Sequence, residues 1–258
     1  QGLTLAASLM ALCVLLILLV PLLIREHPCE RLLPWSTGVE RPQGPRAGSK
    51  TWQAIVIGLY RAIVLPMSLL LILIEACNRI TSGILIGLAP MVTIQELGWT
   101  QITYANWIAI TGVTAAVLGV LCSPWIDRVG ALRILKWVVM FRIGLLGLTA
   151  ALEPYWGIHQ VFESFLMMNA VATQLVTVTL IALFMRLCSP RVAASQFAVY
   201  MALANMTYSL GSGLMVPLSH WTHQAGIMLV CAALIALMWL LIHWVDFERH
   251  DQDLNKLS

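Results

Sequence analysis

The sequence predicts an all-α, polytopic membrane protein with about seven transmembrane helices. Of its 258 residues, 60% are hydrophobic and only 10% are charged, whereas an average soluble domain is about 45–50% apolar and about 25% charged. A spanning helix needs roughly 20 mainly apolar residues, and the chain offers seven stretches of at least that length. This composition excludes an ordinary soluble enzyme. The net charge of +3 forms no basic patch, so no nucleic-acid partner is expected.

Six of the apolar stretches are each about one bilayer long: Leu3–Ile24, Ile102–Cys122, Leu132–Leu152, Val161–Leu187, Phe197–Leu218 and Ala225–Val245. The seventh, Ala54–Ile94, is long enough to cross twice at about 1.5 Å per residue, and it is interrupted by Arg61, Glu75, Asn78 and Arg79.

Positive charges decide between one and two crossings. With one crossing, thirteen of the fifteen Lys and Arg residues fall on one side of the membrane. The opposite connections, near 96–101, 153–160 and 219–224, contain none. Since Lys and Arg concentrate in cytoplasmic loops, we predict an interfacial lead-in and one long helix, bent near Pro90. The N-terminus then lies outside and the C-terminus in the cytoplasm.

The predicted organisation has four parts. Residues 1–24 form a transmembrane helix, 25–53 a Pro- and Gly-rich cytoplasmic loop, 54–245 a six-helix bundle and 246–258 a cytoplasmic tail. Residue 1 is Gln and the first apolar run begins at once, so we expect the chain to be a fragment or a processed product.

Ionisable residues inside predicted helices are costly in the membrane and usually functional. Glu75 and Arg79 stand one helical turn apart with the acid first, which favours an ion pair, and Asn78 lies beside them. One interpretation is that the pair only neutralises itself. The other is that protonation of Glu75 frees Arg79 to hold an anionic group, which couples a proton to a solute.

Other polar residues in the spans allow further interpretations. Glu163 lies near the outer end of its helix, followed by Asn169 and Gln174, and it faces either a cavity or the headgroups. Arg142 is expected to snorkel back to the cytoplasmic end of its helix. The GxxxG pair Gly83 and Gly87 permits close helix contact.

Several chemistries have no motif in the sequence. HExxH, GxSxG, Walker A and GxGxxG sequences do not occur, so neither an enzyme activity nor a cofactor is expected. His220 and His223 have no third ligand nearby, and no metal site is expected. No Lys lies in the middle of a span, since Lys136 stands near the end of its helix, which excludes a retinal Schiff base.

The connection at residues 123–133, SPWIDRVGALR, resembles the major facilitator superfamily loop motif G-x-L-x-D-R-x-G-R-R. Asp127, Arg128 and Gly130 match it, while its first Gly and final basic pair are replaced. In that superfamily a weaker copy lies between helices eight and nine, which implies the C-terminal half of a transporter. The resemblance implies a cytoplasmic gate at these three residues; the alternative is a simple capped turn.

A narrower resemblance is to the muropeptide permease (AmpG-like) and acetyl-CoA transporter branch. It is carried by residues 188–198, with Ser195 where a Thr is usual, and by the Glu75 helix with the segments 88–90 and 96–99 that follow it. Arg191 lies in the first of these segments. It either has a role in transport or only anchors a helix end to anionic headgroups.

The resemblance implies a secondary active transporter that works by alternating access around a site near the membrane midplane. Helices seven and ten of such proteins line the cavity, which gives the candidates for solute binding and proton coupling: Glu75, Asn78, Arg79, Glu163, Asn169 and Gln174. The expected function is symport of protons with a polar organic solute, such as a muropeptide or peptide, across a bacterial inner membrane. Its partners are the lipid bilayer, the solute, protons and the N-terminal half of the same transporter.

Three alternatives stay open at this point. One is a siderophore, sugar or drug transporter of the same superfamily. Another is a seven-helix receptor, which shares the predicted topology. The third is a non-transporting membrane partner that assembles with another chain.

Overall fold

The computed structural model describes residues 8, 10–12, 14–16, 60, 63–188 and 193–245. The chain divides into two units, Gln1–Thr51 and Trp52–Ser258. The described residues of the first unit are helical and fall within the predicted helix 1–24. The predicted loop 25–53, the predicted tail 246–258 and Arg191 lie outside the described residues.

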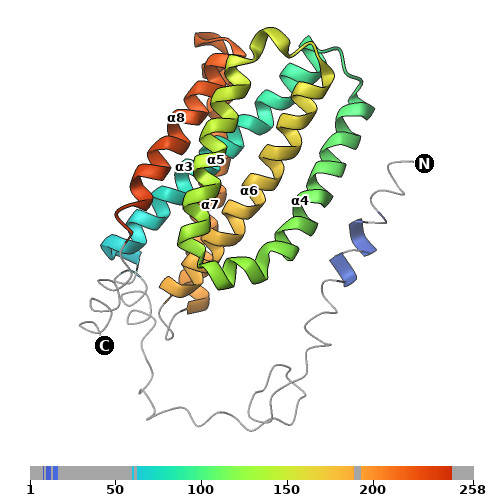
Figure 1. Cartoon of the computed structure of the whole chain (residues 1–258). Helices are drawn as coiled ribbons and strands as arrows, with labels where there is room; N and C mark the ends of the chain where they lie inside the picture. Colours follow the sequence, from blue (N-terminus) through green and yellow to red (C-terminus); the bar gives the residue numbers. More distant parts are fainter. Residues whose placement is uncertain are drawn as a thin grey trace, which may run out of the picture. The chain divides into compact units, whose positions relative to one another are not determined.

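The described part of the second unit is a bundle of long helices (Figure 1). They are α3 (Pro66–Pro90), α4 (Gln101–Val129), α5 (Ala131–Ala151), α6 (His159–Leu187), α7 (Ala193–Trp221) and α8 (Gln224–Ile242), with a short π-helix, η1 (Met91–Glu96), and a 3₁₀ turn, η2 (Glu153–Tyr155). No strand occurs in these described residues. The all-α prediction is therefore confirmed.

Five of the described helical segments are long and apolar enough to cross a membrane: Pro66–Glu96, Gln101–Val129, Ala131–Ala151, His159–Leu187 and Gln224–Ile242. The 29-residue helix α7 is not among them, and its middle carries Asn205, Thr207 and Ser209. The prediction of a polytopic membrane protein is confirmed.

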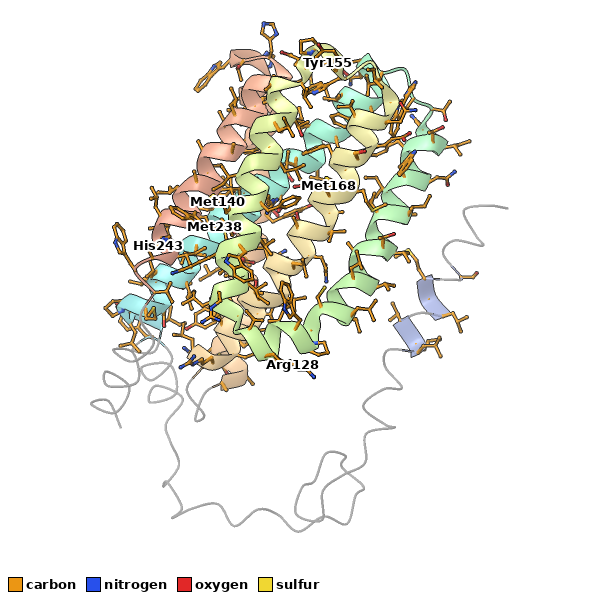
Figure 2. The ribbon with its side chains drawn as sticks, in the orientation of Figure 1. Arg128, Met140, Tyr155, Met168, Met238 and His243 are labelled. Carbon is orange, nitrogen blue, oxygen red and sulfur yellow. The ribbon has the colours of Figure 1, made fainter. Side chains whose placement is uncertain are left out.

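Short connections make successive helices run in opposite directions, so the bundle has two ends. The Gly98 end contains the connections around Gly98, Tyr155 and Thr222, and the Gly130 end contains the α4–α5 turn at Gly130. Figure 2 shows Tyr155 at the first end and Arg128 at the second. The described residues of the Gly98-end connections include no Lys or Arg. In contrast, four described basic residues lie at or near the Gly130 end: Arg128, Arg133, Lys136 and Arg186.

The ambiguous stretch 54–94 crosses once in its described part. From Pro66 the chain is helical without a break to Glu96. It changes from α-helix to π-helix directly after Pro90. Proline has no N–H and so cannot donate the i→i−4 hydrogen bond of an α-helix. A single π-helical turn is a local irregularity of the kind that occurs within α-helices.

Helix α3 is central to the packing, because it lies along both α7 and α8. Helix α5 packs between α8 and α6, and α6 also packs on α4. The α3–α7 contact is a backbone contact: a methyl group on Gly83 would clash with the carbonyl oxygen of Tyr208, and one on Gly211 with that of Ile80. A methyl group on Gly87 would lie 2.8 Å from Met215 Cγ. The close helix contact predicted from the GxxxG pair is confirmed.

Gly130 forms the one-residue turn between α4 and α5 with φ +96° and ψ 129°. This backbone conformation is rarely adopted by residues with a side chain, so we predict that Gly130→Ala lowers the free energy of unfolding by about 1–3 kcal/mol. Chemical unfolding in mixed detergent micelles measures it. Gly147→Ala is the matched control, since Gly147 lies within α5 with open space around its Cα. Equal stability of the two variants would contradict the prediction.

Candidate functional site

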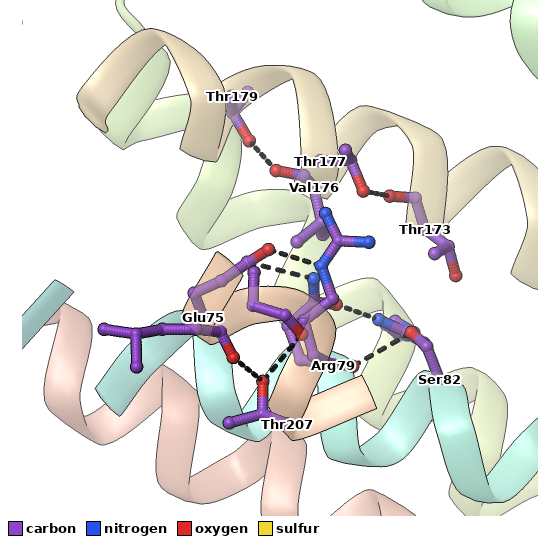
Figure 3. Close-up of polar contacts among 12 residues, drawn as sticks. Glu75, Arg79, Ser82, Thr173, Val176, Thr177, Thr179 and Thr207 are labelled. Atoms are coloured by element: carbon purple, nitrogen blue, oxygen red, sulfur yellow. Dashed lines mark hydrogen bonds and ion pairs between the residues drawn. The ribbon is translucent and has the colours of Figure 1, made fainter. Parts of the chain in front are cut away.

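The core of the site is an ion pair on helix α3. Glu75 and Arg79 are four residues apart, so their side chains share one helix face, and Arg79 Nε lies 2.5 Å from Glu75 Oε1 (Figure 3). Asn78 Nδ2 donates to the other carboxylate oxygen, Oε2, at 3.2 Å. Glu75 and Asn78 are buried. The ion pair predicted from the spacing is confirmed.

Arg142 on α5 joins this cluster, which corrects the prediction that it snorkels to the end of its helix. Its side chain is 0% exposed. Nη1 donates to Asn78 Oδ1 at 2.7 Å, Nε to Asn169 Oδ1 at 3.3 Å and Nη2 to Ser82 Oγ at 3.4 Å. Helix α5 packs against α6, and α3 and α6 together offer three acceptors to the guanidinium. Those acceptors hold it inside the bundle, so it does not reach the headgroups.

A cavity of about 340 Å³ lies beside the cluster. Helices α3, α4 and α6 supply most of its wall, with single residues from α7 and α8. Its polar lining residues are Arg79, Ser82, Tyr104, Thr111, Asn169, Thr173, Gln174 and Tyr208. Helices α3 and α6 are the helices seven and ten of the predicted scheme, so the two predicted walls do face one cavity.

Arg79 and Thr173 both line this cavity and keep hydrogen-bonding atoms that have no partner in the described part of the chain. The terminal nitrogens of Arg79 have no partner among the described residues, and 23% of its side chain is exposed. The hydroxyl of Thr173 is buried and likewise has no partner in the described part of the chain. Figure 3 shows Glu75 and Arg79 on α3 and Thr173 on the neighbouring α6. The exposed part of Arg79 is available to a bound solute.

The predicted candidate residues do not all come together. Asn169 joins the cluster through Arg142, and Gln174 lines the cavity, where its Cγ lies against Gly119 of α4. Glu163 stands apart in a different pocket of about 320 Å³, beside Trp107. It lies six residues before Asn169, roughly 9 Å along the helix axis.

The chain was compared with known protein families, with curated proteins and with solved structures. The model of the Major Facilitator Superfamily matches residues 71–257, more than two thirds of the chain. The chain belongs to the major facilitator superfamily. Proteins of this superfamily are secondary transporters. No curated protein and no solved structure gave a match.

The superfamily match includes all six candidate residues and the loop motif. Asp127 and Arg128 end helix α4 with exposed side chains, and neither makes a side-chain hydrogen bond or ion pair within the described ranges. The turn itself is made by Gly130, whose N–H donates to the carbonyl of Ile126 at 2.9 Å. Asp127 is therefore not needed as a cap. The gating role of these residues stays a prediction, as does the muropeptide permease branch.

Proposed function

We propose that this superfamily member is a proton-coupled symporter that takes up a polar organic solute, such as a muropeptide or peptide, across a bacterial inner membrane. The observation that carries the proposal is the ion pair of buried Glu75 with partly exposed Arg79 beside a cavity. A buried acid paired with a cation inside a membrane protein is a typical element of proton relays. The solute class and the membrane rest on the resemblance to the muropeptide permease branch.

The proposed coupling uses the pair as a switch. Ionised Glu75 holds Arg79 Nε, and a proton bound to Glu75 removes the charge that holds it. Arg79 then turns its guanidinium to the solute in the cavity. Asn78 bonds both Glu75 and Arg142, so it transmits the change to the helices that meet at the cluster. Asn169 and Gln174 contribute polar contacts to the solute.

The remaining predicted roles lie away from this pair. Glu163 is proposed to attract protons or solute at its own pocket. Asp127, Arg128 and Gly130 are proposed as the cytoplasmic gate, and Arg191 as a helix-end anchor to anionic headgroups.

The orientation follows from the charges at the two ends of the bundle. The described Lys and Arg residues outside the middle of the helices lie toward the Gly130 end, which we therefore place in the cytoplasm. We place the C-terminus on the same side and the N-terminus of the chain outside.

The N-terminal half of the transporter is proposed to cover α4 and α7. Helix α4 buries only four of its 29 residues, and α7 only five of 29. Asn205 and Ser209 are exposed in the middle of α7, and polar side chains at that depth usually face protein or water rather than lipid.

The test is uptake of a radiolabelled muropeptide by proteoliposomes containing the full transporter, with the proton gradient imposed and then collapsed by a protonophore. The wild type should accumulate the muropeptide only with the gradient. We predict that Glu75→Gln abolishes gradient-driven uptake and leaves counterflow exchange much less affected, because exchange needs no net proton movement.

Arg133→Gln is the matched control, since Arg133 is exposed at the Gly130 end and should not change uptake. Equal loss of uptake and exchange in Glu75→Gln would show that Glu75 serves binding or structure instead. Gradient-driven uptake of a sugar or siderophore in place of the muropeptide would favour the alternative substrate classes.

A further inference from the structure

The polar cluster contains more positive than negative charge. Its side chains include two guanidinium groups, Arg79 and Arg142, and one carboxylate, Glu75. The carboxylate oxygens are already used, one by Arg79 and the other by Asn78. The hydrogen-bond partners of Arg142 are all neutral: Asn78, Asn169 and Ser82. In the described part of the chain, no second carboxylate bonds either guanidinium. With all three groups ionised, the cluster has a net charge of +1.

A fully buried cation without its own counter-ion is costly in a protein interior, and more so within a membrane. Arg142 is 0% exposed, so water does not screen it. An anion bound in the adjoining cavity would supply the missing charge. We infer that the cavity binds its solute through an anionic group, a carboxylate or a phosphate. This inference rests on the proposed function only in assuming that the solute occupies this cavity.

The cavity has the groups that such an anion needs. The free terminal nitrogens of Arg79 border it, and the planar guanidinium fork matches both carboxylate and phosphate geometry. Thr173 on the facing helix α6 also lines the cavity, and its buried hydroxyl has no partner in the described part of the chain.

Arg142 acts from behind the cavity wall. It bonds Asn169 and Ser82, which both line the cavity, but it does not line the cavity itself. It is a positioning residue whose charge raises the potential of the site, while Arg79 touches the anion.

The first test measures equilibrium binding to the purified full transporter in detergent, by protection against thermal unfolding. The probes are inorganic phosphate and a matched pair of sugars, N-acetylmuramic acid and N-acetylglucosamine, which differ by a lactyl carboxylate. Phosphate or N-acetylmuramic acid should protect at a concentration about tenfold or more below that of N-acetylglucosamine, since a charge-assisted hydrogen bond contributes at least that factor. Arg79→Gln should abolish the difference. Arg133→Gln, an exposed arginine remote from the cavity, should not change it.

The second test varies the net charge of the cluster. Glu75→Gln raises it and should tighten anion binding, while Arg142→Gln lowers it to zero and should weaken binding by about tenfold. The double variant Glu75→Gln/Arg142→Gln returns the charge to +1 and should bind the anion within a few-fold of the wild type. Simple structural damage would predict the reverse, because the double variant would then be the weakest.

Three results would overturn the inference: anions that protect no better than N-acetylglucosamine, protection that is unchanged in Arg79→Gln, or a double variant weaker than both single variants. None of these measurements involves a proton gradient. If anion binding follows the net charge of the cluster but the gradient does not drive uptake, proton coupling is wrong and the anion site stands. If the gradient drives uptake but anion binding does not follow the net charge of the cluster, the anion site is wrong and proton coupling stands.

Discussion

An Arg142→Leu variant should lose about 3 kcal/mol of unfolding free energy, the usual cost of removing one partner from a buried charged network. The guanidinium makes three hydrogen bonds from α5 to α3 and α6. Without it, the side-chain oxygens of Asn78 and Asn169 are left in the interior without this donor, and Glu75 loses the second positive charge near it. The variant should therefore unfold more readily and also lose uptake.

Unfolding in mixed detergent micelles, followed by tryptophan fluorescence, measures the loss. Arg133→Leu is the matched control on the same helix, because Arg133 is exposed and its replacement should change stability by less than about 0.5 kcal/mol. Arg142→Lys should lie between the wild type and Arg142→Leu, since a lysine keeps the charge but not the planar set of donors. If Arg142→Leu were as stable as Arg133→Leu, the cluster would not hold the three helices together.

The helices and the Glu75–Arg79 pair were predictable because both depend on short sequence distances. An apolar run of bilayer length predicts a helix without any knowledge of its neighbours. The i, i+4 spacing places Glu75 and Arg79 on one face whatever the helix packs against. Charge segregation then decided correctly that the described part of 54–94 crosses once.

The environment of Arg142 was not predictable in this way. Its partner Asn78 is 64 residues away and Asn169 is 27 residues away. Helix α5 is apolar on most sides, so the sequence does not indicate that Arg142 reaches toward α3. The available signal was an Arg in the middle of one span together with an Asn in the middle of each of two others, Asn78 and Asn169. The separation of Glu163 from Asn169 was available from the sequence, because six residues correspond to about 120° around a helix of 3.6 residues per turn, and the two side chains line different pockets.

The contact between α3 and α7 should be equally sensitive to small changes. We predict that Gly83→Ala and Gly211→Ala each lower the unfolding free energy by about 1–3 kcal/mol, the cost of overpacking a tight contact. Each added methyl group would clash with a backbone carbonyl of the other helix, and a backbone atom cannot turn away as a side chain can. The weak bond from Ser212 Oγ to the Gly83 carbonyl, at 3.4 Å, would also be lost.

The two substitutions should not be additive. Either methyl group forces α3 and α7 apart, and the separated helices then accommodate the second at little further cost, so the double variant should lose less than the sum of the single losses. Gly213→Ala on α7 is the control, because Gly213 has no atom near its missing Cβ. Additive losses would mean that the helices do not separate as a unit. Uptake should fall with stability, because Ile80, whose carbonyl meets Gly211, is the neighbour of Arg79, and moving that turn of α3 displaces the cation from the cavity.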